Sequence, residues 1–444
     1  MLKTVWTLRW RFWITFLIAC IVAEGLELVY QRLEGSQGLA DSLVTVSGLY
    51  QRIVTARRDP IPRFTAIVEI DPARDPNVSD VAVCAEREYL AHLIERLGQG
   101  RPAPAMIAID KYFGLNSCPS DDSGTRALIA RVTATSDLHP VVVGIRTKEQ
   151  ALDANKGQVV HVVLPHLTYR PQGATFQEGV INVSSDNRRL PLQWAVYPSE
   201  TAARSNSRVV MDTFALAVAR QYDPDLLEKN PRLNRILGEG IQPFIGFLTP
   251  DQFKLSHVYA SDLCGLTTAA SRPTCESKLP LPDFRNKIVL IGENDDRDVY
   301  PTIVGRISGL YLQANYIEAL LDDRFYTPGG PLLDYGFAFL FFLGVELILI
   351  KFHRSPLSLI VYLGGLTASS LIFLYLFVMV GNMYVDPVGV TLTAVLIKML
   401  HAAYDYVRED PPRGHHRTVV EVGAENSSRL TAPPDKKRSD PAHR

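Results

Sequence analysis

Three long apolar blocks near the carboxyl end constrain this chain more than any other feature. They lie at 332–350, 357–380 and 384–403, with short links between them. Each has about the 20 residues that an α-helix needs to cross the hydrocarbon core of a bilayer. We therefore expect three transmembrane helices here, which anchor the preceding residues to a membrane.

A fourth apolar stretch lies near the amino terminus, at 12–30, behind a basic segment at 1–11. Its length and its neighbouring tryptophans favour an uncleaved membrane anchor. The alternative is a cleaved signal peptide, because a basic start, a short apolar region and small residues at Ala19 and Ala23 also fit that pattern. Both interpretations send the next segment out of the cytoplasm.

The charges of the loops predict the orientation. The amino-terminal flank is basic, and the link between the second and third spans carries Lys351 and Arg354 without an acidic residue. Such loops remain cytoplasmic. Four spans then place 31–330 outside and the tail at 405–444 inside. The tail is rich in proline, serine and charge and lacks apolar periodicity, so we expect it to be disordered.

The cysteines agree with this topology. Cys20 lies in the first span, and the other four lie in the segment placed outside. We expect disulfides between Cys264 and Cys275 and between Cys84 and Cys118, and hence an oxidising compartment such as the periplasm of a bacterium. A zinc site is the alternative, but no Cys-x-x-Cys spacing supports it. The sequence thus predicts a multi-pass protein of the bacterial inner membrane.

Short apolar runs alternate with helical patterns through the outer segment. This alternation predicts an α/β domain with a largely parallel sheet and helical cover. No element is predicted between 222 and 280, apart from an extended run at 253–260. The predicted strands are 64–70, 105–109, 140–145, 159–164, 180–183 and 288–291, and the helices are 87–97, 122–133, 212–221 and 308–321.

Apolar residues also recur at helical spacing from 40 to 57, between the first span and the domain. This helix either packs on its own domain or continues the first span and pairs with a second copy of the chain.

Acidic residues follow three of the predicted strands. If these strands are parallel neighbours, the carboxylates converge on one edge of the sheet, where α/β domains bind ligands. They could hold a hard cation or an amine. The alternative is that they are ordinary turn and N-cap aspartates. The candidate ligand-binding residues are Asp71, Asp110, Asp295, Asp296 and Asp298.

The chain lacks the common motifs of enzymes. It has no phosphate-binding loop, nucleophile elbow or His-Glu-x-x-His helix, so we expect no catalytic residues, no metal and no cofactor. Its formal net charge of −1 does not favour nucleic acid as a partner. Within the spans, Glu346 and Lys398 are expected at similar depth, and we expect them either to pair or to reach the cytoplasmic interface independently.

Five segments of the outer domain carry a family pattern. They are TAIVEIDPAR (65–74), AMIAIDKYF (105–113), GVINVSSDNRRLPL (179–192), NKIVLIGENDDRDVYPT (286–302) and GLYLQANYIEALL (309–321). Together with one span before the domain and three after it, they give the chain an arrangement that resembles the type-two CHASE domain, a sensory extracellular domain of bacterial receptors, over residues 10–405. Within the third segment, Gly179, Asn182, Asp186 and Arg188 match the family pattern.

The chain also departs from the family. A Trp-Pro-Trp-Ser-Arg-like element after the first strand is absent, and Asn286 and Gln313 stand where Gly and His are common. Members usually continue into a cyclase, kinase or cyclic-dinucleotide domain, and we expect a standalone form here.

The resemblance implies a non-enzymatic sensor of an unidentified small molecule, which acts within a homodimer, through a separate membrane or cytoplasmic effector protein, or both. A structural subunit of an envelope assembly and a periplasmic hydrolase are the alternatives.

Overall fold

The computed structural model describes residues 13–14, 16–22, 49, 51–55, 61–71, 83–114, 123–153, 158–164, 177–183, 187–267, 274–276, 280–295, 298–352, 356–385, 391 and 394. The chain divides into two units. One comprises Met1–Leu28 with Gly389–Arg444, and its described residues between 13 and 22 are helical. The other, Val29–Val388, holds the sheets and the remaining helices.

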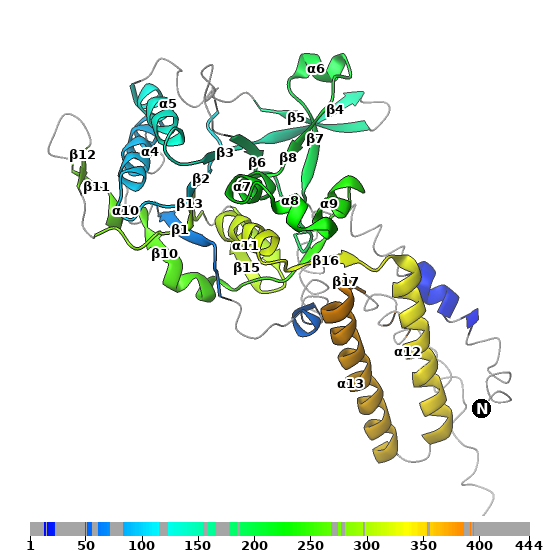
Figure 1. The fold of residues 1–444 in the computed structure, drawn as a ribbon. Coiled ribbons are helices and arrows are strands. Elements are labelled where there is room, and N and C mark those ends of the chain that lie inside the picture. Colours follow the sequence, from blue (N-terminus) through cyan, green and yellow to red (C-terminus); the bar gives the residue numbers. More distant parts are fainter. Residues whose placement is uncertain are drawn as a thin grey trace, which may run out of the picture. The chain divides into compact units, whose positions relative to one another are not determined.

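A six-stranded parallel sheet forms the centre of the larger unit (Figure 1). Its central strand β13 comes late in the sequence and pairs with both β1 and β2. The prediction of a largely parallel sheet is therefore confirmed. In spatial order the strands are β10 (His257–Tyr259), β1 (Thr65–Ile70), β13 (Ile288–Glu293), β2 (Met106–Asp110), β3 (Val141–Ile145) and β6 (Gln177–Val180).

Helices cover both faces of this sheet. Val289 and Ile291 of β13 pack in the cluster that includes α4 (Val83–Gly98) and α5 (Ser123–Ser136). Ile288 and Leu290 pack on the opposite face. That face is covered by α7 (Phe214–Tyr222) and α11 (Gly309–Leu321). Burial on both faces explains why β13 is a continuous apolar run rather than an alternating one.

A second, four-stranded sheet was not expected from the sequence. Only the middle pair, β5 with β7, is parallel, and the outer pairs are antiparallel. The first strand reads TKEQALD, which has no apolar run, so the pattern gave no strand signal there. The order is β4 (Thr147–Asp153), β5 (Gln158–Val163), β7 (Gln193–Tyr197) and β8 (Val209–Asp212), and the short α6 (Glu200–Arg204) follows β7.

The segment between 222 and 280 consists of short elements. The extended run predicted at 253–260 is wrong for most of its length, because the 3-10 helix η1 continues to Ser256 and a helical turn begins at Ala260. The elements are α8 (Leu226–Lys229), α9 (Pro231–Gly238), β9 (Phe244–Ile245), η1 (Pro250–Ser256), β10, α10 (Ala260–Leu263), β11 (Gly265–Thr267) and β12 (Thr274–Glu276).

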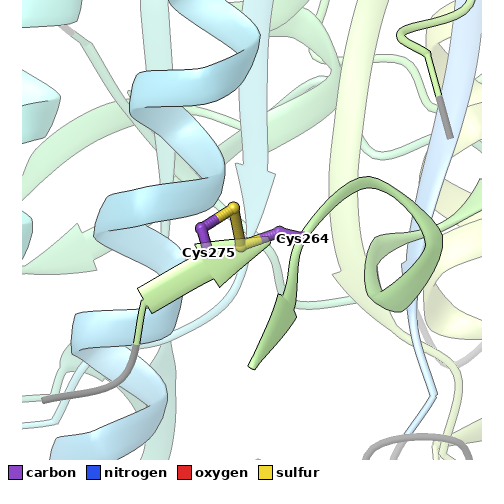
Figure 2. Close-up of a disulfide and its surroundings, with 2 residues drawn as sticks. All are labelled: Cys264 and Cys275. Atoms are coloured by element: carbon purple, nitrogen blue, oxygen red, sulfur yellow. A yellow bond between two sulfur atoms is a disulfide. The ribbon is translucent and has the colours of Figure 1, made fainter. Parts of the chain in front are cut away.

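A disulfide joins Cys264, at the end of α10, to Cys275 in β12 (Figure 2). It links the paired strands β11 and β12, and Cys264 is buried in the cluster under α4. One of the two pairings expected from the sequence is thus present. The other lies outside the described part, since Cys118 and the side chain of Cys84 are not described.

Two long helices follow the domain, α12 (Pro331–Phe352) and α13 (Pro356–Gly381). Both are long and apolar enough to cross a membrane by length and composition. They cover the second and third expected spans. A Cβ at Gly344 of α12 would lie 3.0 Å from Leu366 of α13, so the glycine lets the two helices approach closely. Most of the first and fourth expected spans lies outside the described residues.

Four further short strands lie near α11 and the long helices. β14 (Val299–Thr302) and β15 (Gly305–Ser308) form a hairpin just before α11. β16 (Phe325–Pro328) follows α11 and pairs with β9 and with β17 (Met383–Tyr384). The turn expected at 381–383 after the third span therefore includes a residue that pairs with the domain.

Candidate functional site

The ends of β1, β13 and β2 form what we call the carboxyl edge of the main sheet. Glu69 of β1 is in register with Gly292 of β13, and Gly292 with Asp110 of β2. These three strands are therefore the parallel neighbours on which the acidic-edge hypothesis depends. The missing side chain at Gly292 leaves room for Leu310, because a Cβ there would lie 2.6 Å from Leu310 Cδ1.

The first group at this edge surrounds Glu69, which is only 5% exposed. One of its carboxylate oxygens lies 2.8 Å from His257 Nε2. Asn294 Nδ2 donates to the other oxygen at 3.1 Å, and the Tyr311 hydroxyl donates at 3.4 Å to the oxygen that His257 contacts. Burial alone would raise the pKa of Glu69, but the hydrogen bonds from His257, Asn294 and Tyr311 outweigh it and hold the pKa below its ordinary value.

The second group lies on the opposite face of the sheet and is centred on Lys111, directly after β2. Its ammonium donates to Glu86 of α4 and, at 3.0 Å, to Glu293 at the end of β13. Burial lowers the pKa of Lys111, and the attraction of Glu293 offsets only part of this effect. The group joins a helix and two strands through one buried cation.

The third group contains Asp110 and Asp298. The Tyr300 hydroxyl donates to Asp298 at 2.7 Å. The Asp298 carboxylate lies at the amino end of α11, where a Cβ on Gly309 would clash with it. A helix amino terminus favours a negative charge. Burial, and then the charge of Asp298, raise the pKa of Asp110 to about 7, although Arg146 opposes this.

The described residues among those predicted, Asp71, Asp110, Asp295 and Asp298, therefore lie at one edge of the sheet but are divided among separate groups. Asp71 directly follows β1, and Asp295 interacts electrostatically with Lys111. Asp296 lies outside the described residues. Within the described part of the chain, no three His, Cys, Asp or Glu side chains gather closely enough to hold a metal ion. The role of these residues in binding a ligand stays a prediction.

Sequence reasoning missed Glu69, Lys111 and His257. One signal was present for Glu69, since a carboxylate within the buried run TAIVEI needs a partner. Its partner His257 is 188 positions away in the sequence, in a segment without periodicity. Nothing local could identify that pairing.

Several residues of the family-like segments have structural contacts. Asn182 accepts from Thr147 N at 2.7 Å and donates to Thr147 O at 3.0 Å. Buried Asn315 likewise accepts from Leu248 N at 2.6 Å and donates to Leu248 O at 3.1 Å. A Cβ on Gly179 would lie 2.6 Å from the backbone of α7. These residues therefore hold loops and helices against the sheet.

Gln313, at the position where His is common, donates to Ile181 O at 3.0 Å. It thus joins α11 to the segment after β6. Glu346 lies on the long apolar helix α12, whereas Lys398 is outside the described residues, so their pairing stays a prediction.

Comparison with known proteins supplies the family. A model of the CHASE2 domain matches residues 14–348, which is well over half of the chain. Searches of curated proteins and of solved structures found no match. The matched range includes β1, β2 and the carboxyl edge, as well as α11 and most of α12. The chain belongs to the CHASE2 domain family, a family of extracellular sensory domains.

Proposed function

We propose that this protein is a non-enzymatic sensor of the bacterial inner membrane, with its α/β domain in the periplasm and four membrane-spanning helices. It relays a periplasmic signal to a separate partner protein. The observation that carries this proposal is the match to an extracellular sensory domain family, in a chain with helices long and apolar enough to span a membrane.

The chemistry of the carboxyl edge supports recognition rather than catalysis. Three of its described carboxylates already have internal partners: Glu69 is held by His257, Glu293 by Lys111, and Asp298 by the Tyr300 hydroxyl. A hydrolytic site needs a base that is free to activate water. Reorganising these paired groups around a polar ligand would instead give two states with different ligand affinity, which is what a sensor requires.

The alternative is a protein-binding subunit of an envelope assembly. It is supported by a surface hollow of about 180 Å³ near the amino ends of the strands, lined by Ile61, Phe284 and other mainly apolar residues. Leu255 beside it is 96% exposed. An apolar surface of this kind suits contact with another protein.

Purification of the intact protein from its native membrane in mild detergent separates these proposals. We expect a kinase, cyclase or other cytoplasmic effector in fixed ratio to it. Envelope or transport components alone would favour the assembly subunit, and the absence of any companion would contradict the relay to a partner.

A second measurement addresses the ligand. The intact protein is heated with pools of small polar metabolites, and a saturable rise in the melting temperature identifies a binder. The matched variant is Glu69→Gln. If the ligand binds at the carboxyl edge, we expect this variant to show a smaller rise in melting temperature. Turnover of a pooled compound that Asp110→Asn abolishes would contradict the non-enzymatic assignment.

A further inference from the structure

Two chain segments next to predicted membrane spans, and the helical segment before the domain, converge on one small sheet, β9–β16–β17. β16 leads directly into α12, and β17 directly follows α13. Gln51, in the helical segment before the domain, donates to Ile245 O of β9 at 3.1 Å. This sheet and the cluster of buried hydrophobic side chains packed against it form what we call the junction.

The loop after α13 is bound to the domain by main-chain hydrogen bonds. Thr327 N donates to Asn382 O at 3.0 Å, and Gly329 N donates to Tyr384 O at 2.7 Å. The Thr327 hydroxyl adds a further bond to Asn382 O at 3.2 Å. β17 is thus a strand of the domain's own sheet rather than a loose link between two membrane helices.

Side-chain packing reinforces these strands. The rings of Phe244 in β9 and Tyr384 in β17 lie 4.3 Å apart, and both are buried. Val54 from the helical segment before the domain is fully buried in the same cluster, together with Leu374 and Val378 of α13. Close-packed interiors transmit displacement because they deform little. Movement of the strands should therefore reach α13.

Helix α11 connects the junction to the carboxyl edge. Tyr311, in its first turn, donates to Glu69. Three residues separate its end from the start of β16, and the guanidinium of one of them, Arg324, donates to Gly246 O, next to β9. At 1.5 Å per residue the helix extends about 20 Å. A shift of α11 caused by ligand at the carboxyl edge would therefore be delivered to β16.

We propose that the junction is the coupling device of the receptor, in which displacement of α11 moves β16 and β17 and so slides α13 against α12. This inference rests on the proposed sensor function and assigns its route of transmission. It makes Tyr384 a positioning residue that connects the domain to the membrane helices.

Hydrogen exchange of the intact protein in lipid nanodiscs tests the coupling without a known ligand. Tyr384→Ala should accelerate exchange about tenfold or more in β16, in the last turn of α11 and in the outer part of α13. Met383→Ala is the matched control on the same strand, because Met383 is only half-buried. It should leave α11 and α13 unchanged. Changes limited to 383–385 would overturn the proposal.

A milder variant distinguishes local coupling from general unfolding of the domain. Thr327→Val removes only the hydroxyl that bonds Asn382 O, and we expect smaller changes in the same segments. Exchange in β4 and β5, outside the junction, should stay constant in both variants. Acceleration throughout the domain with Thr327→Val would contradict a local coupling.

The functional consequence is measured on the complex with an effector. A partner that remains bound to Tyr384→Ala but no longer responds to a ligand would agree with the proposal. A partner that still responds would refute the junction and leave the sensor function intact. If no effector or ligand is found, the sensor function fails, while the exchange experiment still decides whether the junction couples the two parts.

Discussion

Glu318 of α11 holds the start of β1 through Thr65. Its Oε1 accepts both the Thr65 backbone N–H, at 2.7 Å, and the Thr65 hydroxyl, at 2.8 Å. The same carboxylate accepts the N–H groups of Phe64 and Arg63 at 2.9 and 3.0 Å. One side chain on a helix therefore satisfies the backbone donors at and just before the start of β1.

We expect Glu318→Gln to destabilise the domain by about 2–3 kcal/mol, because an amide nitrogen would face a backbone N–H in place of a charged acceptor. Thr65→Val is the matched variant. It removes only the hydroxyl and should cost about 1 kcal/mol. Thermal unfolding of the intact protein in detergent measures both. Equal stability of Glu318→Gln and the wild type would show that the carboxylate is not needed there.

Stability should depend on Asp110 between about pH 4 and pH 7. The raised pKa, about 7, means that the folded protein keeps a proton which the unfolded chain has already lost at pH values above about 4. The cost develops as the pH rises through this window and is constant above it. Asp110→Asn should therefore stabilise the protein at pH 8, by about 2–4 kcal/mol at most, and not at pH 4.

Unfolding midpoints measured from pH 4 to pH 8 test this expectation. Asp251→Asn, on an exposed carboxylate of η1, is the control and should show no such window. A difference between Asp110→Asn and the wild type that does not change with pH would contradict burial of this carboxyl beside Asp298.

Glu69 should have the opposite dependence. Its pKa is lowered in the folded protein, so the stability that its ionised form contributes is present above the unfolded pKa of about 4.3 and is lost as the pH falls below it. Glu69→Gln should cost about 1–3 kcal/mol at pH 6 and progressively less under more acid conditions. The measurement is the difference in unfolding free energy between the two proteins as a function of pH. A constant difference would exclude a role for the charge.

A double-mutant cycle can test the contact between Gly292 and Leu310. Gly292→Ala places a Cβ 2.6 Å from Leu310 Cδ1 and should destabilise the domain by about 1–3 kcal/mol. Leu310→Ala opens space at the same position, so the double variant should be more stable than the sum of the two single changes predicts. Strictly additive changes in thermal stability would show that the two residues do not press on each other.

Thiol counting tests the predicted disulfides. Alkylation of the unfolded, unreduced protein should label Cys20 alone if Cys84 and Cys118 are also paired, and three cysteines if only Cys264 and Cys275 are joined. Removing the latter bond with Cys264→Ser and Cys275→Ser should cost about 3 kcal/mol, through the entropy of the short loop that it closes. Peptide mass spectrometry identifies the pairs directly.

Local patterns in the sequence were sufficient for much of this protein. The apolar blocks at 332–350 and 357–380 predicted α12 and α13, and the runs at 64–70 and 288–291 predicted β1 and β13. Burial of a strand or helix on one or both sides imposes a spacing of apolar residues that is visible within a few positions of the sequence. The parallel sheet then followed from the alternation of strands with helices.

Which elements meet could be learned only from the three-dimensional structure. It placed β13 between β1 and β2, brought His257 to Glu69 across 188 positions, and made β17 a strand of the domain. These contacts join segments whose sequences carry no information about their partners, since each follows from the packing of the whole chain. Local patterns therefore predicted β1, β13, α12 and α13, because burial imposes a short period, whereas the packing of the whole chain determined how the carboxyl edge is organised and how it connects to α12 and α13.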